Sequence, residues 1–321
     1  MSFRDRRIRP LPGLADLIRI ALQGGWTLKD LGDAQRIPVC ASGLPSVEAG
    51  QAAVTWIGHA SFLLRTGHGD AVLLDPVWST AVPGVRARLT PPGVPWPDLP
   101  PITAVAISHD HVDHFDRPTL ARLDRETPIL VPLRAGRRWL RRQGFRNVIE
   151  LDWWQDADIA GTRFTCLPAA HWSGRHPFAL YRSLWASWLV TTRDGHRVYH
   201  GGDTAYSAHF AAIGRRHPGI DLFLAPAGSY APEWFQSSAH MDPEDAVQAC
   251  LDVGASAMAP MHWGAFVLSD EPLLAPPLRT RQAWAHTGRS PAGFWDPAVG
   301  ETRILLPRTP ITALKTLETA S

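Results

Sequence analysis

Short apolar runs closed by turn-forming residues recur along most of the chain and are typical of β-strands. They predict strands over Val54–Ile57, Ser61–Arg65, Ala71–Leu74, Ala104–Ser108, Ile129–Val131, Arg163–Leu167, Ser187–Thr191, Arg197–His200, Leu222–Ala225 and Ala257–Met261. Helical spacing predicts helices over Arg117–Arg125 and Ala135–Gln143. A further helix is expected over Asp242–Val253, because Pro243 suits a first helical position and Asp242 suits an N-cap. Two packed sheets with helices outside would bury the apolar faces of these elements.

The first 50 residues differ from this strand-rich pattern. Leu14, Leu17 and Ile18 have helical spacing, and Gly24-Gly25 would end that helix. We expect residues 1–50 to be an N-terminal extension that is packed on the body, or that acts as a lid or as a membrane-touching element helped by the nearby basic stretch Arg4–Arg9. No repeat, low-complexity tract or change in composition divides residues 51–321, which are expected to form one domain.

Composition excludes several classes of protein. Of the 321 residues, 45% are hydrophobic and 19% charged, which is a globular balance and not that of a disordered chain. The net charge of +2 gives no support for nucleic-acid binding. Cys40, Cys166 and Cys250 are odd in number and far apart, so no disulfide framework is expected and a cytoplasmic location is favoured. The sequence shows no signal peptide and no membrane-spanning run, and a soluble protein is expected.

The histidines are unevenly distributed, and their densest group directly follows the predicted strand that begins at Ala104. This group is Ser108-His109-Asp110-His111-Val112-Asp113-His114. Three imidazoles and two carboxylates so close together cannot be core filling, because each would need a buried partner. His109 and His111 alternate by two and can face one ion, while Asp113 and His114 turn toward a second.

Four residues are too few to hold two metals, so further ligands are expected at other strand ends. His171, Asp203 and His262 each follow a predicted strand closely. Glycines beside Asp203 and His262 would let the backbone approach the metals. Imidazole nitrogens and carboxylate oxygens without cysteine suit zinc, and they exclude a cysteine-based structural zinc finger.

The string His109–His114 resembles the HxHxDH motif of the metallo-β-lactamase superfamily, with the later His, Asp and His in the superfamily's order. The resemblance spans about residues 54–270 and implies an α+β fold, an αββα four-layer sandwich with a two-metal site along one edge. Residues 51–321 are then a hydrolase domain. The implied ligand sets for two Zn²⁺ are His109, His111 and His171 for one ion and Asp113, His114 and His262 for the other, with Asp203 bridging. Asp113 and Asp203 are also expected to be catalytic, and Asp110 is expected to face away, so that Asp110→Asn should be mild.

Longer stretches of sequence around the motif resemble one particular branch of this superfamily. Thr55–Ser61, Leu184–Trp188, Gly228–Phe235 and His240–Ala246 resemble the branch that contains N-acyl-phosphatidylethanolamine-hydrolysing phospholipase D. This implies cleavage of a phosphodiester, with a phospholipid-like substrate favoured. A soluble small molecule such as a lactone or a phosphorylated sugar stays open as the alternative substrate. Diiron redox members of the superfamily carry Glu where this chain has His111, which favours zinc and hydrolysis, and a non-catalytic binding module is disfavoured because no expected ligand is missing.

Several residues outside the ligand set are candidates for supporting roles. His59 and Asp75 are expected to hold ligand imidazoles or, alternatively, to be ordinary surface and turn residues. His240 matches a functional histidine of the branch and is expected to contact the substrate or act as a general acid. The candidates for the substrate rim are Tyr206, Tyr230 and Trp234. Expected partners are the substrate and, peripherally, a membrane, with the oligomeric state left open.

Overall fold

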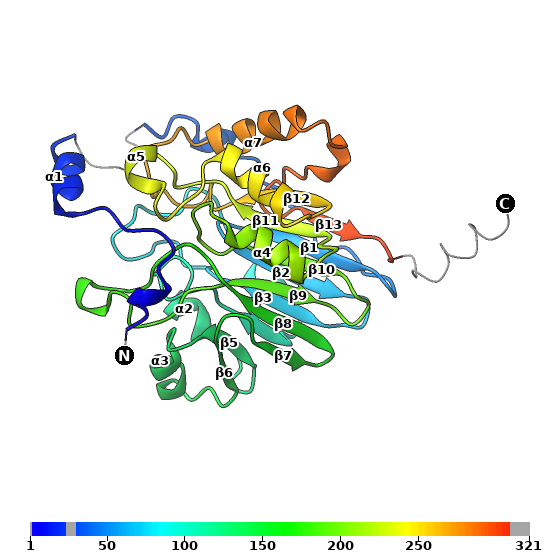
Figure 1. The fold of residues 1–321 in the computed structure, drawn as a ribbon. Helices are drawn as coiled ribbons and strands as arrows, with labels where there is room; N and C mark the ends of the chain where they lie inside the picture. The colour runs from blue at the N-terminus through cyan, green and yellow to red at the C-terminus, as the bar shows by residue number, and fades with distance from the viewer. Residues whose placement is uncertain (1, 24–29, 309–321) are drawn as a thin grey trace.

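A computed structural model describes residues 2–23 and 30–308 of the chain (Figure 1). Gly24-Gly25, predicted to end the first helix, lie outside the described residues. One sheet has the strand order β13-β1-β2-β3-β4-β5-β6 and the other β12-β11-β10-β9-β8-β7. The strands of the first sheet are β1 (Ala52–Gly58), β2 (Ser61–Thr66), β3 (Ala71–Leu74), β4 (Ala104–Ala106), β5 (Ile129–Pro132), β6 (Val148–Leu151) and β13 (Thr302–Leu305). Those of the second are β7 (Asp156–Ile159), β8 (Thr162–Leu167), β9 (Ser187–Thr191), β10 (Arg197–His200), β11 (Leu222–Pro226) and β12 (Ala257–Met261).

Helices lie outside both sheets, so the molecule has four layers. The helices are α1 (Leu14–Leu22), α2 (Arg117–Leu120), α3 (Arg137–Arg142), α4 (His209–Arg216), α5 (Glu233–Gln236), α6 (Pro243–Asp252) and α7 (Ala275–His286). Helices α4, α6 and α7 cover the outer face of the second sheet, while α2 and α3 cover that of the first. The predicted αββα sandwich of the α+β class is therefore confirmed.

The central core lies between the two sheets and is built by alternation along each strand. On β2, Phe62 and Leu64 face this core while Leu63 faces the outer helices. On β11, Leu224 faces the core and Phe223 faces α4 and α6. Because both faces of these strands are buried, they appear in the sequence as continuous apolar runs.

Every strand expected from the sequence is present. The strands that the sequence pattern did not predict, and helix α7, have weak apolar patterns. Strands β7 and β13 are partly exposed edge strands with few apolar residues, and the sequence pattern missed them together with β6. Helix α2 ends at Leu120, earlier than predicted. Helix α7 has a Pro-Pro pair in its first turn, and its buried face combines these prolines with Thr280 and Trp284, so its apolar periodicity is weak. Among the described residues, no helix is both long enough and apolar enough to cross a bilayer.

Candidate metal centre

The candidate ligands converge on one edge of the sandwich because of strand direction. Strands β3, β4, β5 and β6 run parallel, as do β10, β11 and β12. The carboxyl ends of parallel strands point to the same edge of a sheet, where connecting loops can place functional side chains. His109 follows β4, His171 follows β8, and Asp203 and His262 follow β10 and β12.

The first group of candidate ligands consists of His109, His111, His171 and Asp203. His111 Nδ1 lies 2.8 Å from His109 Nε2 and 3.3 Å from His171 Nε2. Asp203 Oδ2 lies 3.9 Å from His109 Nε2 and 3.7 Å from His171 Nε2. Four potential ligand atoms thus face a common point.

The second group contains Asp113, His114 and His262, together with His59. His114 Nε2 and His262 Nε2 are 3.2 Å apart, and Asp113 Oδ2 lies 3.7 Å and 3.6 Å from them. Asp203 also reaches this group, with Oδ2 3.3 Å from His114 Nε2 and Oδ1 3.0 Å from His262 Nε2. Asp203 therefore stands between the two groups, where a bridging carboxylate would stand.

The spacing of these atoms fits tetrahedral metal coordination. Ligand atoms about 2.0–2.1 Å from one zinc ion stand about 3.3 Å apart. The distances of 3.2 Å between His114 and His262 and 3.3 Å between His171 and His111 agree with this spacing, and the other distances within the two groups lie on either side of it, from 2.8 to 3.9 Å. Burial lowers the pKa of His109 and of His171 well below the usual value, so both imidazoles are neutral and present a lone pair.

The charges at the centre also favour a cation. Burial alone would raise the pKa of Asp113 and of Asp203. The neighbouring His114 outweighs this effect and holds both pKa values well below the usual range. Burial alone would lower the pKa of His262 and of His114. The carboxylate of Asp203 instead raises the pKa of His262 to about 9 and that of His114 well above its usual value. The buried carboxylates thus attract positive charge, which a bound metal would supply in place of these protons.

Neighbouring groups fix the orientation of the imidazoles. His114 Nδ1 donates to Asp75 Oδ2 at 2.7 Å, and His171 Nδ1 donates to the carbonyl oxygen of Ala239 at 2.9 Å. His109 Nδ1 donates to Ser108 Oγ at 2.9 Å. These bonds leave each Nε2 facing the centre, as is usual for metal-bound histidines.

His59 and Asp75 lie directly behind the candidate ligands. His59 is buried with its pKa lowered to about 3, mainly by burial, so its neutral ring donates from Nε2 to Asp113 Oδ2 at 3.0 Å. Asp75 also accepts from the backbone nitrogen and the hydroxyl of Ser108, both at 2.6 Å. His59, Asp75 and His262 have positive φ angles of 57°, 41° and 67°. Such left-handed backbone costs about 1–3 kcal/mol per residue and is concentrated at functional sites.

A cavity of about 600 Å³ opens onto this centre, and His111, Asp113, His171, Asp203 and His240 contribute to its lining. The imidazole of His240 lies with its ring centroid 5.2 Å from that of His171 and 5.5 Å from that of His262. Its Nδ1 is buried and has no hydrogen-bond partner among the residues that the structure describes. Burial lowers the pKa of His240 to about 4, so its ring is neutral.

The N-terminal segment, expected from the sequence to pack on the body or to act as a lid, supplies one wall of this cavity. The sequence pattern did not show which cavity the segment would line. The lining from this segment is Arg4, Arg7, Leu11, Pro12 and Leu17. The segment is held in place because the backbone nitrogen of Phe3 donates to the carbonyl oxygen of Tyr181 at 2.8 Å and Arg6 pairs with Asp152 at 3.0 Å. Its approach to the ends of β4, β8 and β10, about 90 or more residues away, depends on tertiary packing, for which the sequence has no local signal.

None of the three aromatic residues expected at the substrate rim is part of the cavity lining. The Tyr206 hydroxyl donates to Asp252 Oδ2 at 2.6 Å, and the Tyr230 ring packs under the guanidinium of Arg279 at 4.8 Å. Neither belongs to the cavity lining, because each side chain has a partner within the helical layer. Trp234 is 38% exposed beside the cavity, with the Arg19 guanidinium 4.2 Å from its ring centroid. The wall instead contains Trp172, Tyr181 and Phe235.

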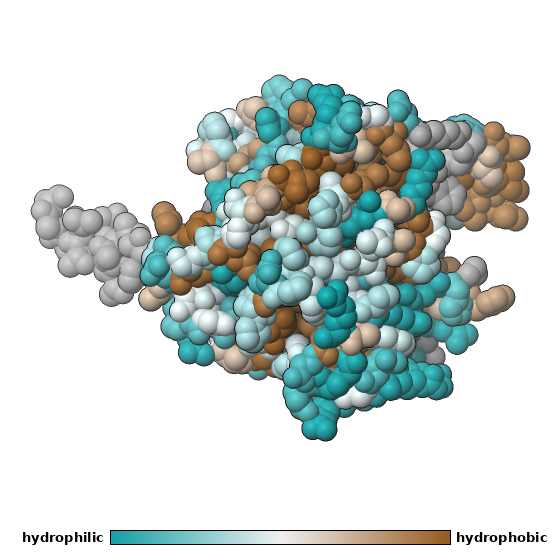
Figure 2. Space-filling view, turned by 180° about the vertical axis from the view of Figure 1, so that it is seen from behind, coloured by the Kyte–Doolittle hydropathy of each residue, from teal (hydrophilic) through white to brown (hydrophobic). Residues whose placement is uncertain are grey.

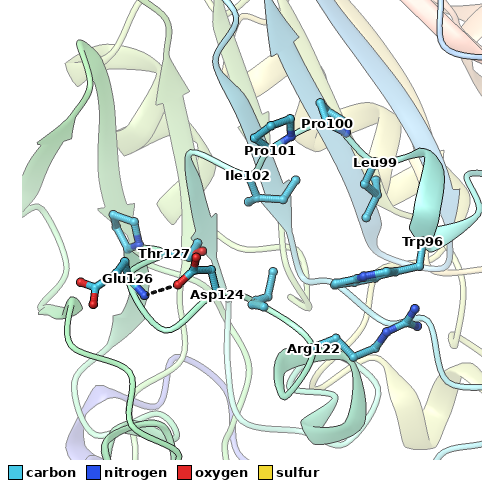
Figure 3. A pocket seen from close by; sticks show the side chains of 11 residues that line it. Trp96, Leu99, Pro100, Pro101, Ile102, Arg122, Asp124, Glu126 and Thr127 are labelled. Carbon is cyan, nitrogen blue, oxygen red and sulfur yellow. Dashed lines mark hydrogen bonds between the residues drawn. The ribbon is translucent and has the colours of Figure 1, made fainter.

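A second hollow, of about 430 Å³, lies at the opposite ends of β4 and β5 (Figure 3). Trp96 and Ile102 line it, and Asp124 Oδ1 accepts from the backbone nitrogen of Glu126 at 2.9 Å. Its lining contains no histidine or cysteine, so it offers no comparable donor set.

Comparisons with known proteins agree with this centre. The family described as "Beta-lactamase superfamily domain" matches residues 70–263. An uncharacterised protein of Mycobacterium tuberculosis is 41% identical over 77% of this chain and 69% of its own length. A metal-dependent hydrolase of Nitratidesulfovibrio vulgaris is 30% identical over 69% of this chain and 84% of its own. The chain therefore belongs to the β-lactamase superfamily, among its metal-dependent hydrolases.

The branch is the one that the sequence motifs indicated. N-acyl-phosphatidylethanolamine-hydrolyzing phospholipase D 1 of Caenorhabditis elegans is 33% identical over 66% of this chain, which spans 64% of that relative. The solved structure of Igni18, a metallo hydrolase of Ignicoccus hospitalis, has a TM-score of 0.59 and is 22% identical over 79% of this chain and 98% of its own. This structural likeness shows the fold, and the sequence relatives support the predicted branch.

Proposed function

We propose that the protein is a binuclear zinc phosphodiesterase that cleaves a phospholipid-like substrate in the manner of a phospholipase D. The observation that carries the proposal is the cavity in which apolar walls, two arginines and the candidate metal centre meet. Leu11, Leu180 and Phe235 offer an apolar surface for acyl chains, while Arg4 and Arg7 can pair with a phosphate. A free sugar phosphate would not need the apolar walls.

Each group of residues at the centre has its own role in the proposed reaction. The two ligand groups would hold one zinc ion each, and Asp203 would be shared. Zinc bound there would act as a Lewis acid toward a phosphoryl oxygen and lower the pKa of an attacking water. Asp75 and the Ala239 carbonyl orient ligand imidazoles, and His59 orients Asp113. His240 offers its unpaired Nδ1 to a substrate oxygen.

Exposed apolar side chains at the same edge support peripheral contact with a membrane. Leu14, Ile18 and Leu22 form one stripe of α1 and are 76%, 52% and 84% exposed. Phe178, in the loop that carries the cavity residues Leu180 and Tyr181, is 85% exposed. Figure 1 shows α1 projecting at the left edge, and Figure 2 shows apolar surface projecting at the corresponding right edge. We therefore also propose that the described segment 2–23 of the N-terminal extension acts as a membrane-touching wall of the cavity of residues 51–321.

The direct test is a hydrolysis screen of the zinc-loaded protein against phospholipids in vesicles, a soluble phosphodiester and lactones, with Asp203→Asn as the matched control. We expect turnover of phospholipid and of the soluble phosphodiester, and loss of both activities in the control. Lactone hydrolysis without phosphodiester hydrolysis would contradict the proposal and favour the small-molecule alternative. The cytoplasmic location stays a prediction, consistent with three free cysteines.

A further inference from the structure

A further pocket, separate from the cavity at the candidate metal centre, gathers positive charge between α3 and the loop that carries Phe178. Its volume is about 360 Å³. The basic side chains in its lining are Arg117, Arg134, Arg138, Arg142, Arg175 and His176, and these residues define the arginine pocket. The lining contains one carboxylate, Asp110, which already accepts bonds from the Gly174 backbone nitrogen at 2.9 Å and from Ser183 Oγ at 2.7 Å.

Two of these arginines come from one face of α3. Arg138 and Arg142 are four residues apart on α3, so they lie on one face of the helix. Both are exposed, and among the ion pairs of the described residues neither has an acidic partner. The adjacent Arg137, by contrast, pairs with Glu150 at 2.6 Å. The charge of Arg138 and Arg142 is therefore available to an external anion.

Arg175 forms a fixed, half-buried side of the same pocket. Its Nη1 donates to the carbonyl oxygens of Asp110 and Phe115 at 3.1 and 2.9 Å, which holds the guanidinium in place. Burial, and then the like charge of Arg117, lowers the pKa of Arg175 below its usual value. The carboxylates of Asp110, Asp116 and Asp113 offset part of this lowering. Several guanidinium groups in the lining of one pocket favour an anion with several oxygens, such as phosphate, which can pair with more than one of them.

The surroundings of the arginine pocket distinguish a lipid phosphate from a soluble one. His176 of the pocket has its ring 6.4 Å from that of Phe178, which projects into solvent. The apolar stripe of α1 projects from the same edge of the molecule. A soluble phosphate would gain nothing from apolar side chains beside its site, whereas a membrane offers phosphate groups and apolar chains together.

We propose that the arginine pocket binds the phosphate of an anionic phospholipid headgroup when the apolar edge of the protein rests on a membrane. The site deepens the proposed function by making docking selective for anionic lipid, and it is distinct from the cavity in which the substrate is cleaved. Because docking requires no turnover, it can be measured whether or not the lipid is a substrate.

The test is co-sedimentation with vesicles of phosphatidylcholine alone or mixed with phosphatidylglycerol. It compares the wild type, the double variant R138E/R142E and a matched control, R215E/R216E on α4, whose arginines lie outside the arginine pocket. We expect the wild type to prefer vesicles with phosphatidylglycerol and R138E/R142E to bind them at least about tenfold more weakly, since each arginine contributes about fivefold near an anionic surface. The control should retain binding, and all three proteins should hydrolyse the soluble phosphodiester equally.

Three results would overturn the proposal. If R138E/R142E binds the vesicles as tightly as the wild type, the arginine pocket is not used for docking. If R215E/R216E loses as much vesicle binding as R138E/R142E, the loss reflects the net charge of the protein and not the pocket. Calorimetric binding of inorganic phosphate that depends on Arg138 and Arg142, without vesicle binding, would assign the pocket to a soluble anion. If selective docking is found but no lipid is hydrolysed, the anion site stands and the proposed function fails.

Discussion

His240 lies between the candidate ligands and the cavity, and its role can be separated from theirs. Its ring is close enough to Asp203 and His262 for a ligand role, yet both ligand groups are complete without it. We expect His240→Ala to keep two zinc ions and to lower kcat/KM about 10²-fold, as loss of a positioned hydrogen-bonding group does. His240→Gln, which can still form a hydrogen bond, should recover part of this loss. Zinc analysis that shows lost metal would make His240 a ligand instead.

Asp110 has a structural role that its place in the metal motif did not reveal. As expected, it is in neither ligand group, but it ties the loop of Gly174 and Ser183 to the motif. An asparagine can replace both contacts if the serine hydroxyl rotates, so Asp110→Asn should be mild. Asp110→Ala removes both and should cost about 1–3 kcal/mol of stability and raise KM, because the same loop carries the cavity residues Leu180 and Tyr181.

Thermal unfolding, zinc analysis and steady-state kinetics on the two Asp110 variants check this account. Both variants should retain their metal. A loss of zinc in Asp110→Ala would place the residue in the centre itself, and unchanged KM and melting temperature would remove it from the loop contact.

Among the elements, the first turn of α6 contains a carboxyl group, Asp245, that makes the stability of the protein depend on pH. Burial, and then the neighbouring Asp242, raises the pKa of Asp245 from 3.8 to about 6. A raised pKa means that the folded state holds this proton more tightly than the unfolded state does. The stabilising contribution is therefore complete below about pH 4 and is lost as the pH rises through about 6.

Asp245→Asn keeps the group neutral and should stabilise the protein at pH 8 but not at pH 4. The gain should not exceed about 1 kcal/mol, because the half-exposed carboxyl is screened by solvent. This corresponds to a melting temperature about 2 °C higher. A difference between variant and wild type that is the same at both pH values would contradict the assigned cause.

Helix α1 is the element on which lipid contact depends. Replacing Leu14, Ile18 and Leu22 by glutamine should weaken vesicle binding about tenfold or more, because these side chains would no longer be transferred out of water. Hydrolysis of the soluble phosphodiester should not change. Leu278→Gln on α7, where the leucine is 53% exposed, is the control for loss of surface apolarity. Equal vesicle binding by the triple variant and the wild type would refute membrane contact through α1.

The elements also show what the sequence could predict. Strands such as β2 and β11, buried on both faces, gave clear apolar runs, whereas the exposed edge strands β7 and β13 did not. The motif after β4 and the single residues after β8, β10 and β12 were found because each follows a strand. The cavity wall from residues 2–23 could not be found, because it depends on long-range packing and not on local spacing.

At the scale of the whole molecule, two sheets bring residues from distant parts of the sequence to one edge, and the N-terminal segment closes that edge over a cavity. The central claim is that this edge holds two zinc ions that share Asp203. Anomalous diffraction at the zinc edge, combined with metal analysis, tests it most directly. We predict two zinc ions per chain, about 3.5–4 Å apart as in other two-metal sites, one at each ligand group with Asp203 between them. A single metal ion, or a metal bound away from Asp203, would contradict this account.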